Sequence, residues 1–567
     1  MASDQTEQSQ PIKTKNPFKR GAAKRADPTV FWVSLSFIVL FCVLAGMFPD
    51  AVGSIGSTAL DWVIANFGWG FILIVAALVA FTLVLAVSRY GSIPLSRGGE
   101  SPEFSTMSWI ALMFGAGMGV GLVFYGVAEP ISHLTNPPPD SGAAPGTNEA
   151  ARTALRYSFF HWGIQPWAIY SVVGLALAYS TYRKGRGNLL SAPFTPVLGD
   201  PNRGWGKVIN IFAIVVTKFG TATSLGLAGL QIAAGLSYVF GFSPTNNTAV
   251  IVILAMTGFF VLTAASGVEK GMKWASNTNL VLAFLLMMFV FLVGPTVLIL
   301  NELTRATGDY LFQFLQMTFH TAGFSEGGLS WLSEWTIFFW AWWVSWALHV
   351  GTFLARVSKG RTIRQFVTGV VLVPTLGSMV WFSIIGGTSM HLQMTGQQNI
   401  AAAQEQGGQA QALFSMLSAF PAFTVTGLVA IILVAVFFVT GADTGAIVLG
   451  TLSSYGISEP RRPISVIWGL TSAAVAIVLI VVGGVDAIQT FVILAASPFI
   501  FIMGAMAIAF YADLRKDPLR QEVSPPVRPH APDPMEGKSP SGSPADTSTN
   551  TEEPSESATK RRLYGGP

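Results

Sequence analysis

The chain is poor in cysteine and in charged residues. Its 567 residues include a single cysteine, Cys42, so we expect neither an intrachain disulfide nor a thiolate metal site. Charged residues make up only 11% of the chain, against 51% hydrophobic residues, and the mean hydropathy is +0.53. An average soluble domain carries roughly 25% charged residues. The composition therefore excludes an ordinary soluble domain and indicates a protein that crosses a membrane several times.

The motifs of common enzymes are also missing. The sequence has no zinc-ligand spacing, no phosphate-binding P-loop and no nucleophile–base pair within one segment. Residues 1–29 are basic and lack an apolar core, so we expect no cleavable signal peptide. The isoelectric point near 9.1 comes from basic loop residues and indicates membrane topology rather than nucleic-acid binding. We predict neither an enzyme nor a nucleic-acid-binding protein, and no cofactor beyond a coupling ion.

Long apolar segments, by contrast, are abundant. A membrane-spanning helix needs about 18 or more mostly apolar residues in succession. Such segments lie at 30–48, 68–88, 106–135, 153–182, 206–240, 249–265, 275–301, 335–357, 363–390, 423–455, 463–483 and 486–512. They predict an all-α polytopic membrane protein with about twelve transmembrane helices, several of them long enough to be tilted or broken.

The basic residues predict how the chain is oriented. Cytoplasmic loops carry an excess of Lys and Arg. The even-numbered loops of this twelve-span scheme contain Arg89, Arg97, Arg183, Lys184, Arg186, Arg203, Lys207, Lys270, Lys273, Arg356, Lys359, Arg361, Arg364, Arg461 and Arg462. The odd-numbered loops contain little beyond Arg152 and Arg305. We therefore predict that both termini lie in the cytoplasm.

Two segments outside the spans differ in composition. Residues 307–321 have mixed polarity and predict an external amphipathic helix. Residues 513–567 are rich in Pro, Ser, Thr, Asp and Glu, which predicts a disordered cytoplasmic tail. The expected organisation is a basic N-terminal segment (1–29), a membrane domain (30–512) and this tail.

Residues 335–346 contain five tryptophans and two phenylalanines in twelve positions. On a helix such a run covers more than one face, so its tryptophans cannot all be interface anchors. Several indole faces together can hold a quaternary ammonium ion without a counter-charge. An aromatic stripe is usually plain packing, but the density here favours a cation-binding site.

The fourth span begins with aromatic residues around Pro166. Trp167 and Tyr170 are three residues apart and therefore share a helix face. Trp162 and Trp167 alone would be interpreted as interface anchors, and beside the tryptophan-rich span they become candidates for the same cation site. His161 is as consistent with a packed, hydrogen-bonded residue as with a functional one.

Glycines are concentrated in the third span, where Gly115, Gly117, Gly119 and Gly121 fall within seven residues. Each weakens a helix by about 1 kcal/mol relative to alanine. Such a helix can unwind at mid-membrane and turn backbone N–H groups toward an anionic part of a substrate. Close helix packing through small residues explains the same pattern equally well.

Polar residues inside spans are costly and often functional. The fifth span contains Thr217, Lys218 and Thr221, and the tenth contains Thr440 and Asp443. Hydroxyl and carbonyl oxygens at a broken helix would suit Na⁺, whereas ionisable groups would suit a proton relay. Snorkelling or a buried pair explains Lys218 equally well.

Taken together, these motifs resemble the betaine/choline/carnitine transporter (BCCT) family. The tryptophan-rich run followed by residues 353–364 resembles the family signature, and the resemblance continues through 118–130, 161–170 and 276–279. It covers residues 30–512, the expected transporter domain. Within the family, the chain is most similar to sodium-coupled glycine betaine carriers.

This resemblance implies a fold and a site. The fold would be of the LeuT type, with two inverted five-helix repeats at about 106–301 and 335–512, in a homotrimer with the amphipathic helix near its centre. The implied substrate-binding residues are Trp162, Trp167, Tyr170, Trp342, Trp343, Trp346, Gly117, Met118 and Gly119. The implied sodium ligands are Gly115, Met118, Phe437, Thr440 and Gly441 in one site, and Thr217 and Thr221 in the other.

The chain departs from the family pattern near these sites. An Ala-Leu-His sequence ending at His349 replaces the usual Ser-Pro-Phe of betaine carriers, and Lys218 stands where an apolar residue is usual. Gly441 removes a hydroxyl that would bind sodium, whereas Leu280 stands where sodium-independent exchangers have arginine. Exchange is therefore disfavoured. Both Na⁺ and H⁺ stay open as the coupling ion, with Lys218 and His349 as coupling candidates.

The sequence thus predicts a symporter in the plasma (inner) membrane that imports a zwitterionic quaternary ammonium compound, with glycine betaine as the leading candidate. Its partners would be this small molecule, membrane lipid and copies of itself. One alternative is a proton-coupled carrier of ectoine, proline, choline, carnitine or a sulfonium analogue. Another is a membrane-embedded osmosensor without transport, although the tail lacks the long basic helix of osmosensing relatives.

Overall fold

The structure, a computed structural model, describes residues 26–517 except 98–99, 118, 244, 267–268 and 324. Within these residues the protein is helical, and one isolated bridge between Pro94 and Thr362 is the only extended pairing. The predictions for the basic N-terminal segment and for the tail fall almost wholly on residues 1–25 and 518–567, outside the described part.

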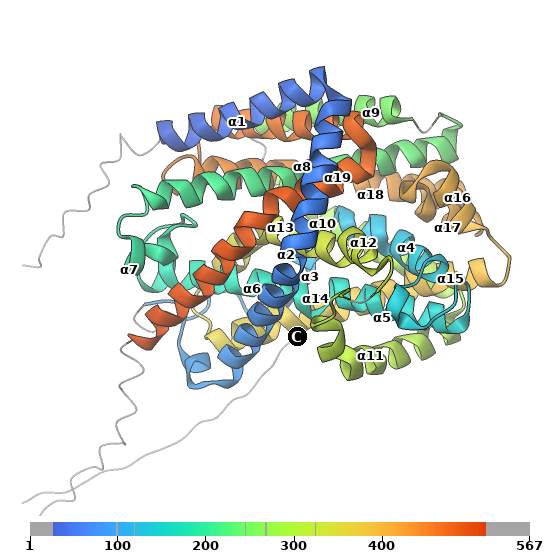
Figure 1. Ribbon diagram of the computed structural model, residues 1–567, viewed down its shortest axis with the longest axis horizontal. Coiled ribbons are helices and arrows are strands. Elements are labelled where there is room, and N and C mark those ends of the chain that lie inside the picture. Colours follow the sequence, from blue (N-terminus) through green and yellow to red (C-terminus); the bar gives the residue numbers. More distant parts are fainter. Residues whose placement is uncertain are drawn as a thin grey trace, which may run out of the picture. The chain divides into compact units, whose positions relative to one another are not determined.

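The helices follow the chain in the order shown in Figure 1. Their bounds are α1 Pro28–Met47, α2 Pro49–Val87, η1 Arg89–Ser92, α3 Thr106–Gly117, α4 Val120–Thr135, η2 Pro139–Ser141, α5 Asn148–Trp162, α6 Ile164–Ala178, η3 Tyr179–Arg183, η4 Ala192–Phe194, α7 Thr195–Leu198, α8 Trp205–Phe240, α9 Asn246–Ser266, α10 Glu269–Val293, α11 Thr296–Thr318, α12 Gly328–Leu332, η5 Ser333–Ile337, α13 Phe338–Val357, α14 Ile363–Trp381, η6 Phe382–Gly386, α15 Gly387–Met394, α16 Ile400–Gly407, η7 Gln409–Gln411, α17 Ala412–Ser418, α18 Phe423–Leu452 and α19 Arg462–Arg515.

Eight helices in the described part are long and apolar enough to cross a membrane, and the bent pair formed by α10 and α11 raises this number to nine. The chain is therefore an all-helical, multi-pass membrane protein. Two of the apolar segments predicted as spans, 106–135 and 153–182, are each divided into two shorter helices.

Glycines mark the places where helices break. In the third predicted span, α3 ends at Gly117 and α4 begins at Val120, and the intervening Gly119 is extended (φ −162°, ψ 177°). The predicted break in the glycine-rich stretch is thus confirmed. In the fourth span, the break falls at Gly163 (φ −96°, ψ −124°). Pro166 follows in the first turn of α6, where a missing N–H is tolerated.

The eleventh and twelfth predicted spans, 463–483 and 486–512, are two helical segments of the element labelled α19, and they meet at a kink where the prediction separates them. Its backbone leaves the helical conformation only at Gly483 and Gly484, and the positive φ of Gly484 (62°) suits glycine. Helix α19 continues to Arg515, beyond the predicted domain end at residue 512. Beyond it, the carboxylate of Asp517 binds Arg183 through two hydrogen bonds of 2.7 Å.

The two helices that carry the polar residues of the fifth and tenth predicted spans are continuous. Both α8 and α18 run without interruption through their polar residues. The hydroxyl of Thr221 donates to the Thr217 carbonyl at 2.9 Å, and that of Thr440 donates to the Val436 carbonyl at 2.9 Å. The carbonyls of these segments therefore take part in helical hydrogen bonding, and the assignment of Thr217, Thr221 and Thr440 as sodium ligands stays a prediction.

The amphipathic helix begins earlier than predicted. The chain turns by 110° between α10 and α11, so the seventh span ends at Val293 and α11 starts at Thr296 rather than at residue 307. Pro295 occupies the N-cap position of α11, since proline cannot continue the preceding helix.

Helix packing places α13 between α6 and α8, and α8 in turn packs against α18 and α19 (Figure 1). Several basic loops also lie together. Arg97 donates to the Arg183 carbonyl at 2.7 Å, Arg364 donates to the C-terminal end of α2, and Lys207 pairs with Asp27 at 2.9 Å. These contacts join loops that the charge pattern assigns to one side of the membrane.

Candidate functional site

A cavity of about 410 Å³ lies among α3, α4, α6, α8, α13 and α18. Most of the residues predicted for a substrate or ion site line it. They are Trp162, Trp167, Tyr170, Trp342, Trp343, Trp346, Gly119, Gly115, Phe437, Thr440, Gly441, Thr221 and His349. The structure thus brings together residues from six helices and from the glycine break, which are far apart in the sequence.

Six aromatic residues, Trp162, Trp167, Tyr170, Trp342, Trp343 and Trp346, form what we call the aromatic cage. The rings of Trp162 and Trp343 meet edge to face with centroids 4.8 Å apart, and those of Trp342 and Trp343 stack at 5.1 Å. Trp167 and Tyr170 meet edge to face at 5.4 Å. The cage therefore presents both ring faces and ring edges.

Hydrogen bonds fix three of the indoles. Trp343 donates to the His161 carbonyl at 3.0 Å, and Trp346 donates to the Gly220 carbonyl at 3.0 Å. Trp162 donates to the Glu129 carboxylate at 2.7 Å. The buried indole N–H of Trp342 has no partner among the described residues. It is a buried donor left unsatisfied beside the cavity, which is uncommon for a buried polar group.

The cavity carries little charge. None of the described lining residues is Asp, Glu, Lys or Arg. A cation held here would interact with aromatic faces rather than with a carboxylate. Hydroxyl and amide groups supply the polar part of the wall, from Thr221, Thr440, Thr444, Asn277 and Asn279.

A comparison with known protein families shows to which family the chain belongs. The model of the betaine/carnitine/choline family of transporters matches residues 29–519. The chain belongs to the BCCT family. Its members are membrane transporters, not enzymes.

Characterised relatives support the same assignment. The glycine betaine transporter OpuD of Bacillus subtilis is 43% identical over 87% of this chain and 95% of its own length. The betaine/ectoine transporter LcoP of Corynebacterium glutamicum is 39% identical over 87% of this chain and 78% of its length. The ectoine/hydroxyectoine transporter of Virgibacillus pantothenticus is 37% identical over 87% of this chain and 97% of its length.

Three residues that the BCCT resemblance implies are not among the described lining residues. Gly117 is the last residue of α3, and Met118 lies outside the described residues. Thr217 is buried but is not one of the lining residues. Of the second implied sodium site, only Thr221 therefore reaches the cavity.

Lys218 also faces away from the cavity. Its ammonium group donates to the Trp468 carbonyl at 2.5 Å, to Thr471 Oγ1 at 3.0 Å and to Ser472 Oγ at 2.8 Å, all in α19. The side chain is fully buried and forms no ion pair within the described part of the chain, so it neither snorkels nor pairs with a carboxylate. His349 differs, because it lines the cavity with its ring 4.6 Å from that of Trp346.

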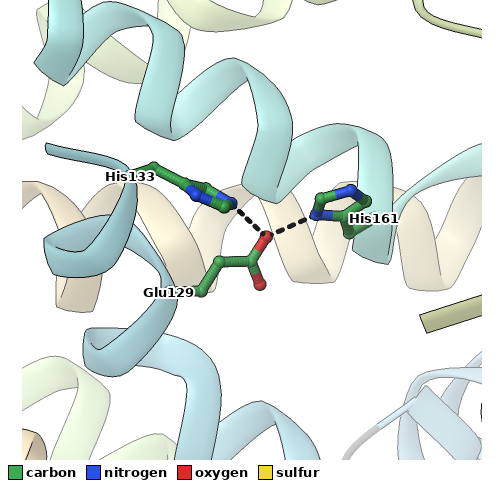
Figure 2. A group of neighbouring side chains, drawn as sticks. All are labelled: Glu129, His133 and His161. Atoms are coloured by element: carbon green, nitrogen blue, oxygen red, sulfur yellow. Dashed lines mark hydrogen bonds and ion pairs between the residues drawn. The ribbon is translucent and has the colours of Figure 1, made fainter. Parts of the chain in front are cut away.

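A buried cluster behind the cage was not predicted. Glu129 and His133 of α4 and His161 of α5 point toward one another, as Figure 2 shows. Glu129 Oε1 lies 2.7 Å from His161 Nδ1 and 3.4 Å from His133 Nε2. Their ligand atoms lie within 4.8 Å of one another, close enough for a divalent metal ion. The four-residue spacing of Glu129 and His133 was visible in the sequence, whereas the approach of His161 depends on the tertiary fold.

Proposed function

We propose that this BCCT transporter is a secondary active symporter that imports a zwitterionic quaternary ammonium compound, with glycine betaine as its leading substrate. One observation carries the proposal: six aromatic side chains surround one cavity in which no described lining residue is charged. Aromatic faces attract a desolvated quaternary ammonium ion by about 0.5–2 kcal/mol each. Several such contacts give useful affinity and still permit release.

The carboxylate of a zwitterion finds donors at the start of α4. Gly119 is the N-cap of this helix, has no side-chain capping bond, and lines the cavity together with Val120, Gly121 and Leu122. The N-terminus of a helix presents free backbone N–H groups and a partial positive charge. We infer that the carboxylate lies against this turn while the ammonium group lies in the aromatic cage.

A second substrate class is ectoine, a cyclic zwitterion. Two similar relatives carry ectoine in their names, LcoP and the Virgibacillus transporter. Choline is a further candidate, since an osmo-independent choline transporter of Acinetobacter baylyi is 37% identical to this chain. The same aromatic cage suits all of these cations, so a competition panel must separate them. Proline, carnitine and a sulfonium analogue belong in that panel.

The coupling ion is Na⁺ or H⁺. Gly115, Phe437, Thr440 and Gly441 lie around one cavity and offer carbonyl and hydroxyl oxygens, the ligands that Na⁺ requires. Gly441 contributes no side-chain oxygen, and His349 adds a group that can carry a proton. We keep Met118, Thr217 and Thr221 as further sodium candidates from the family resemblance.

The finer architecture is also part of the proposal. We infer about twelve spans in a LeuT-type fold, with inverted repeats at about 106–301 and 335–512. The first repeat opens with a helix interrupted at the glycine break, and the second opens with a continuous helix that contains the π-helical turn Ser333–Ile337. We place the protein in the plasma membrane with both termini cytoplasmic. Impermeant thiol labelling of single cysteines introduced into the basic loops of intact cells would check this orientation.

Uptake into proteoliposomes tests the function. Purified protein is given labelled glycine betaine under an inward Na⁺ gradient and, separately, under an inward H⁺ gradient. Accumulation that requires Na⁺ supports the sodium sites, and accumulation driven by H⁺ alone assigns the coupling to protons. If neither gradient drives uptake of betaine, ectoine or choline, the proposal of a symporter fails and a sensor without transport becomes the better explanation.

Trp346 gives the sharpest single-residue check of the cage. We expect Trp346→Ala to raise KM for betaine at least tenfold, because it removes one aromatic contact worth up to about 2 kcal/mol and the hydrogen bond to Gly220. The matched control is Trp205→Ala at the start of α8, where the indole is 70% exposed. Unchanged uptake by the Trp346 variant would remove this residue from the site.

A further inference from the structure

Glu129 is a buried carboxylate that lies behind the aromatic cage rather than in it. Its side chain is fully buried in α4, and it is not one of the residues that line the cavity. Burial of an ionisable group is costly unless hydrogen bonds satisfy it. Glu129 has such bonds on both oxygens, so its partners show what it does.

One oxygen of Glu129 binds the cage directly. Oε2 accepts the indole N–H of Trp162 at 2.7 Å, a contact that joins residues 33 positions apart. The other oxygen, Oε1, lies 2.7 Å from His161 Nδ1, and the second ring nitrogen of His161 lies 3.0 Å from Thr336 Oγ1 (Figure 2). His133 Nε2 lies 3.4 Å from the same oxygen. The carboxylate is thus held from two sides while it holds Trp162.

Trp162 is a central member of the cage. Its ring lies 4.8 Å from that of Trp343 and 6.3 Å from that of Trp342, edge to face in both cases. Edge-to-face contacts set the distance between two rings but define the orientation of each ring only loosely. A hydrogen bond from the indole N–H is directional and therefore fixes the orientation of the indole. The only such bond of this indole goes to Glu129 among the described residues.

The charge of the acceptor adds a second effect. A hydrogen bond to a carboxylate is stronger than one to a neutral group, and it polarises the donor. An indole whose N–H donates to a carboxylate carries more electron density on its ring face, which strengthens its attraction for a cation. Orientation and polarisation therefore act in the same direction.

We propose that Glu129 is a positioning residue of the cation site: through the N–H of Trp162 it sets the orientation and the electron density of that indole. This inference rests on the proposed function, because it assumes that the aromatic cage binds a quaternary ammonium group. His161 holds the carboxylate in place through its hydrogen bond, His133 lies beside it, and Glu129 itself does not touch the substrate.

Equilibrium binding of labelled glycine betaine to the purified protein tests this inference. Glu129→Leu removes the acceptor, and we expect it to weaken binding about tenfold to a hundredfold, the range for a hydrogen bond to a charged group. Glu129→Gln keeps the volume and one oxygen, so a smaller loss is expected. In transport, KM should rise while kcat stays near the wild-type value. Monodisperse elution of Glu129→Gln shows that the fold is intact.

A double-mutant cycle with Trp162→Phe separates positioning from general damage. Phenylalanine has no N–H, so in that background Glu129→Gln should change the affinity by less than about twofold. If the two losses instead multiply, Glu129 acts independently of Trp162 and the inference is wrong. Glu334→Gln is the matched control, since it makes the same chemical change outside the cage, and it should bind like the wild type.

Two further outcomes overturn the inference in distinct ways. If Glu129→Leu binds betaine as tightly as the wild type, the residue has no role in the site. If EDTA weakens binding to the wild-type protein, Glu129, His133 and His161 hold a metal ion, and metal ligation explains the cluster. Failure of the wild-type protein to bind betaine at all would instead contradict the proposed function.

Discussion

At the scale of single residues, Gly121 sets the distance between two indoles of the aromatic cage. A methyl group at this position would lie 2.5 Å from Cη2 of Trp342 and 2.9 Å from Cη2 of Trp162. Carbon atoms cannot approach that closely, so one ring or the first turn of α4 would have to move. The backbone conformation of Gly121 is helical, so its small size matters here rather than its flexibility.

We therefore expect Gly121→Ala to weaken betaine binding roughly tenfold, since overpacking typically costs about 1–3 kcal/mol. The measurement is the dissociation constant of the purified variant, together with its thermal stability. Gly258→Ala in α9 is the control, because a methyl group there would meet nothing within 4 Å. Equal affinities for both variants and the wild type would show that the spacing of these indoles does not matter for binding.

The aromatic residues of the site could be predicted from the sequence, but the residues that contact them could not. Tryptophan density singled out Trp342, Trp343 and Trp346, and all of them line one cavity. Lys218 and Thr217 were selected by their polarity and by the family resemblance, yet neither tells which face of a buried helix points toward a cavity. The bond from Trp162 to Glu129 joins two helices, and no local pattern encodes it.

At the scale of elements, the two coupling candidates lie on different helices with different surroundings. Lys218 of α8 is bound by oxygens of α19 within about one helical turn. His349 of α13 lines the cavity, and its Nδ1 has no partner among the described residues. Coupling requires a group that senses the substrate or the ion, and on these grounds His349 is the better placed of the two.

We expect Lys218→Met to leave the ion requirement of uptake unchanged, with the apparent affinity for the driving ion within about twofold of the wild type. It should lower the melting temperature, because hydrogen bonds of a charged group between α8 and α19 are lost. His349→Gln should instead change the pH dependence or the ion affinity of transport. Uptake measured across pH and Na⁺ concentration checks both variants. A loss of ion dependence in Lys218→Met alone would reverse this assignment.

The ends of α6 and α19 are joined by ion pairs. Arg183 binds Asp517 through two bonds of 2.7 Å, Tyr179 donates to the same carboxylate at 2.7 Å, and Arg186 pairs with Asp513. Asp517 is almost fully buried. When one member of an ion pair is buried, removing either charge lowers the stability of the protein, because a buried charge must be paired. Removing a charge from an exposed pair has little effect.

We expect Asp517→Asn to destabilise the protein by about 1–3 kcal/mol, seen as a lower melting temperature in detergent. The control is Glu149→Gln, which removes a pair with Arg152 whose side chains are 53% and 49% exposed. Such a surface pair contributes about 0–1 kcal/mol. If the two variants melt at the same temperature, the contact between α6 and α19 does not stabilise the fold.

Element boundaries show where sequence patterns succeed. The glycine-rich stretch predicted the break between α3 and α4, because four glycines within seven residues lower the helix propensity of this segment. Hydropathy also placed the two spans of α19, which the structure separates by a kink at Gly483 and Gly484. The start of the amphipathic helix was predicted at residue 307, where the polarity of the sequence changes. In the structure this helix, α11, begins directly after Pro295.

At the scale of the whole molecule, α11 carries an apolar face that the described chain leaves exposed. Phe312 is 91% exposed, and Leu315 and Phe319, three and seven residues further on, are 69% and 57% exposed. These positions share one face of the helix. Because α11 turns 110° away from α10, this face differs from the lipid-facing side of a straight span. Contact with copies of the chain is what the family resemblance implies for it.

We expect Phe312→Asp to convert a trimer into monomers in detergent, because a carboxylate at the centre of an apolar interface would be desolvated without a partner. Light scattering coupled to size-exclusion chromatography gives the mass of each species. The control is Val197→Asp in α7, which is also exposed (69%) but lies in the segment between α6 and α8. A trimeric Phe312→Asp variant would show that this face meets lipid. If the wild-type protein is monomeric, the expected trimer does not form. Transport by that monomer would then show that one chain carries a complete site.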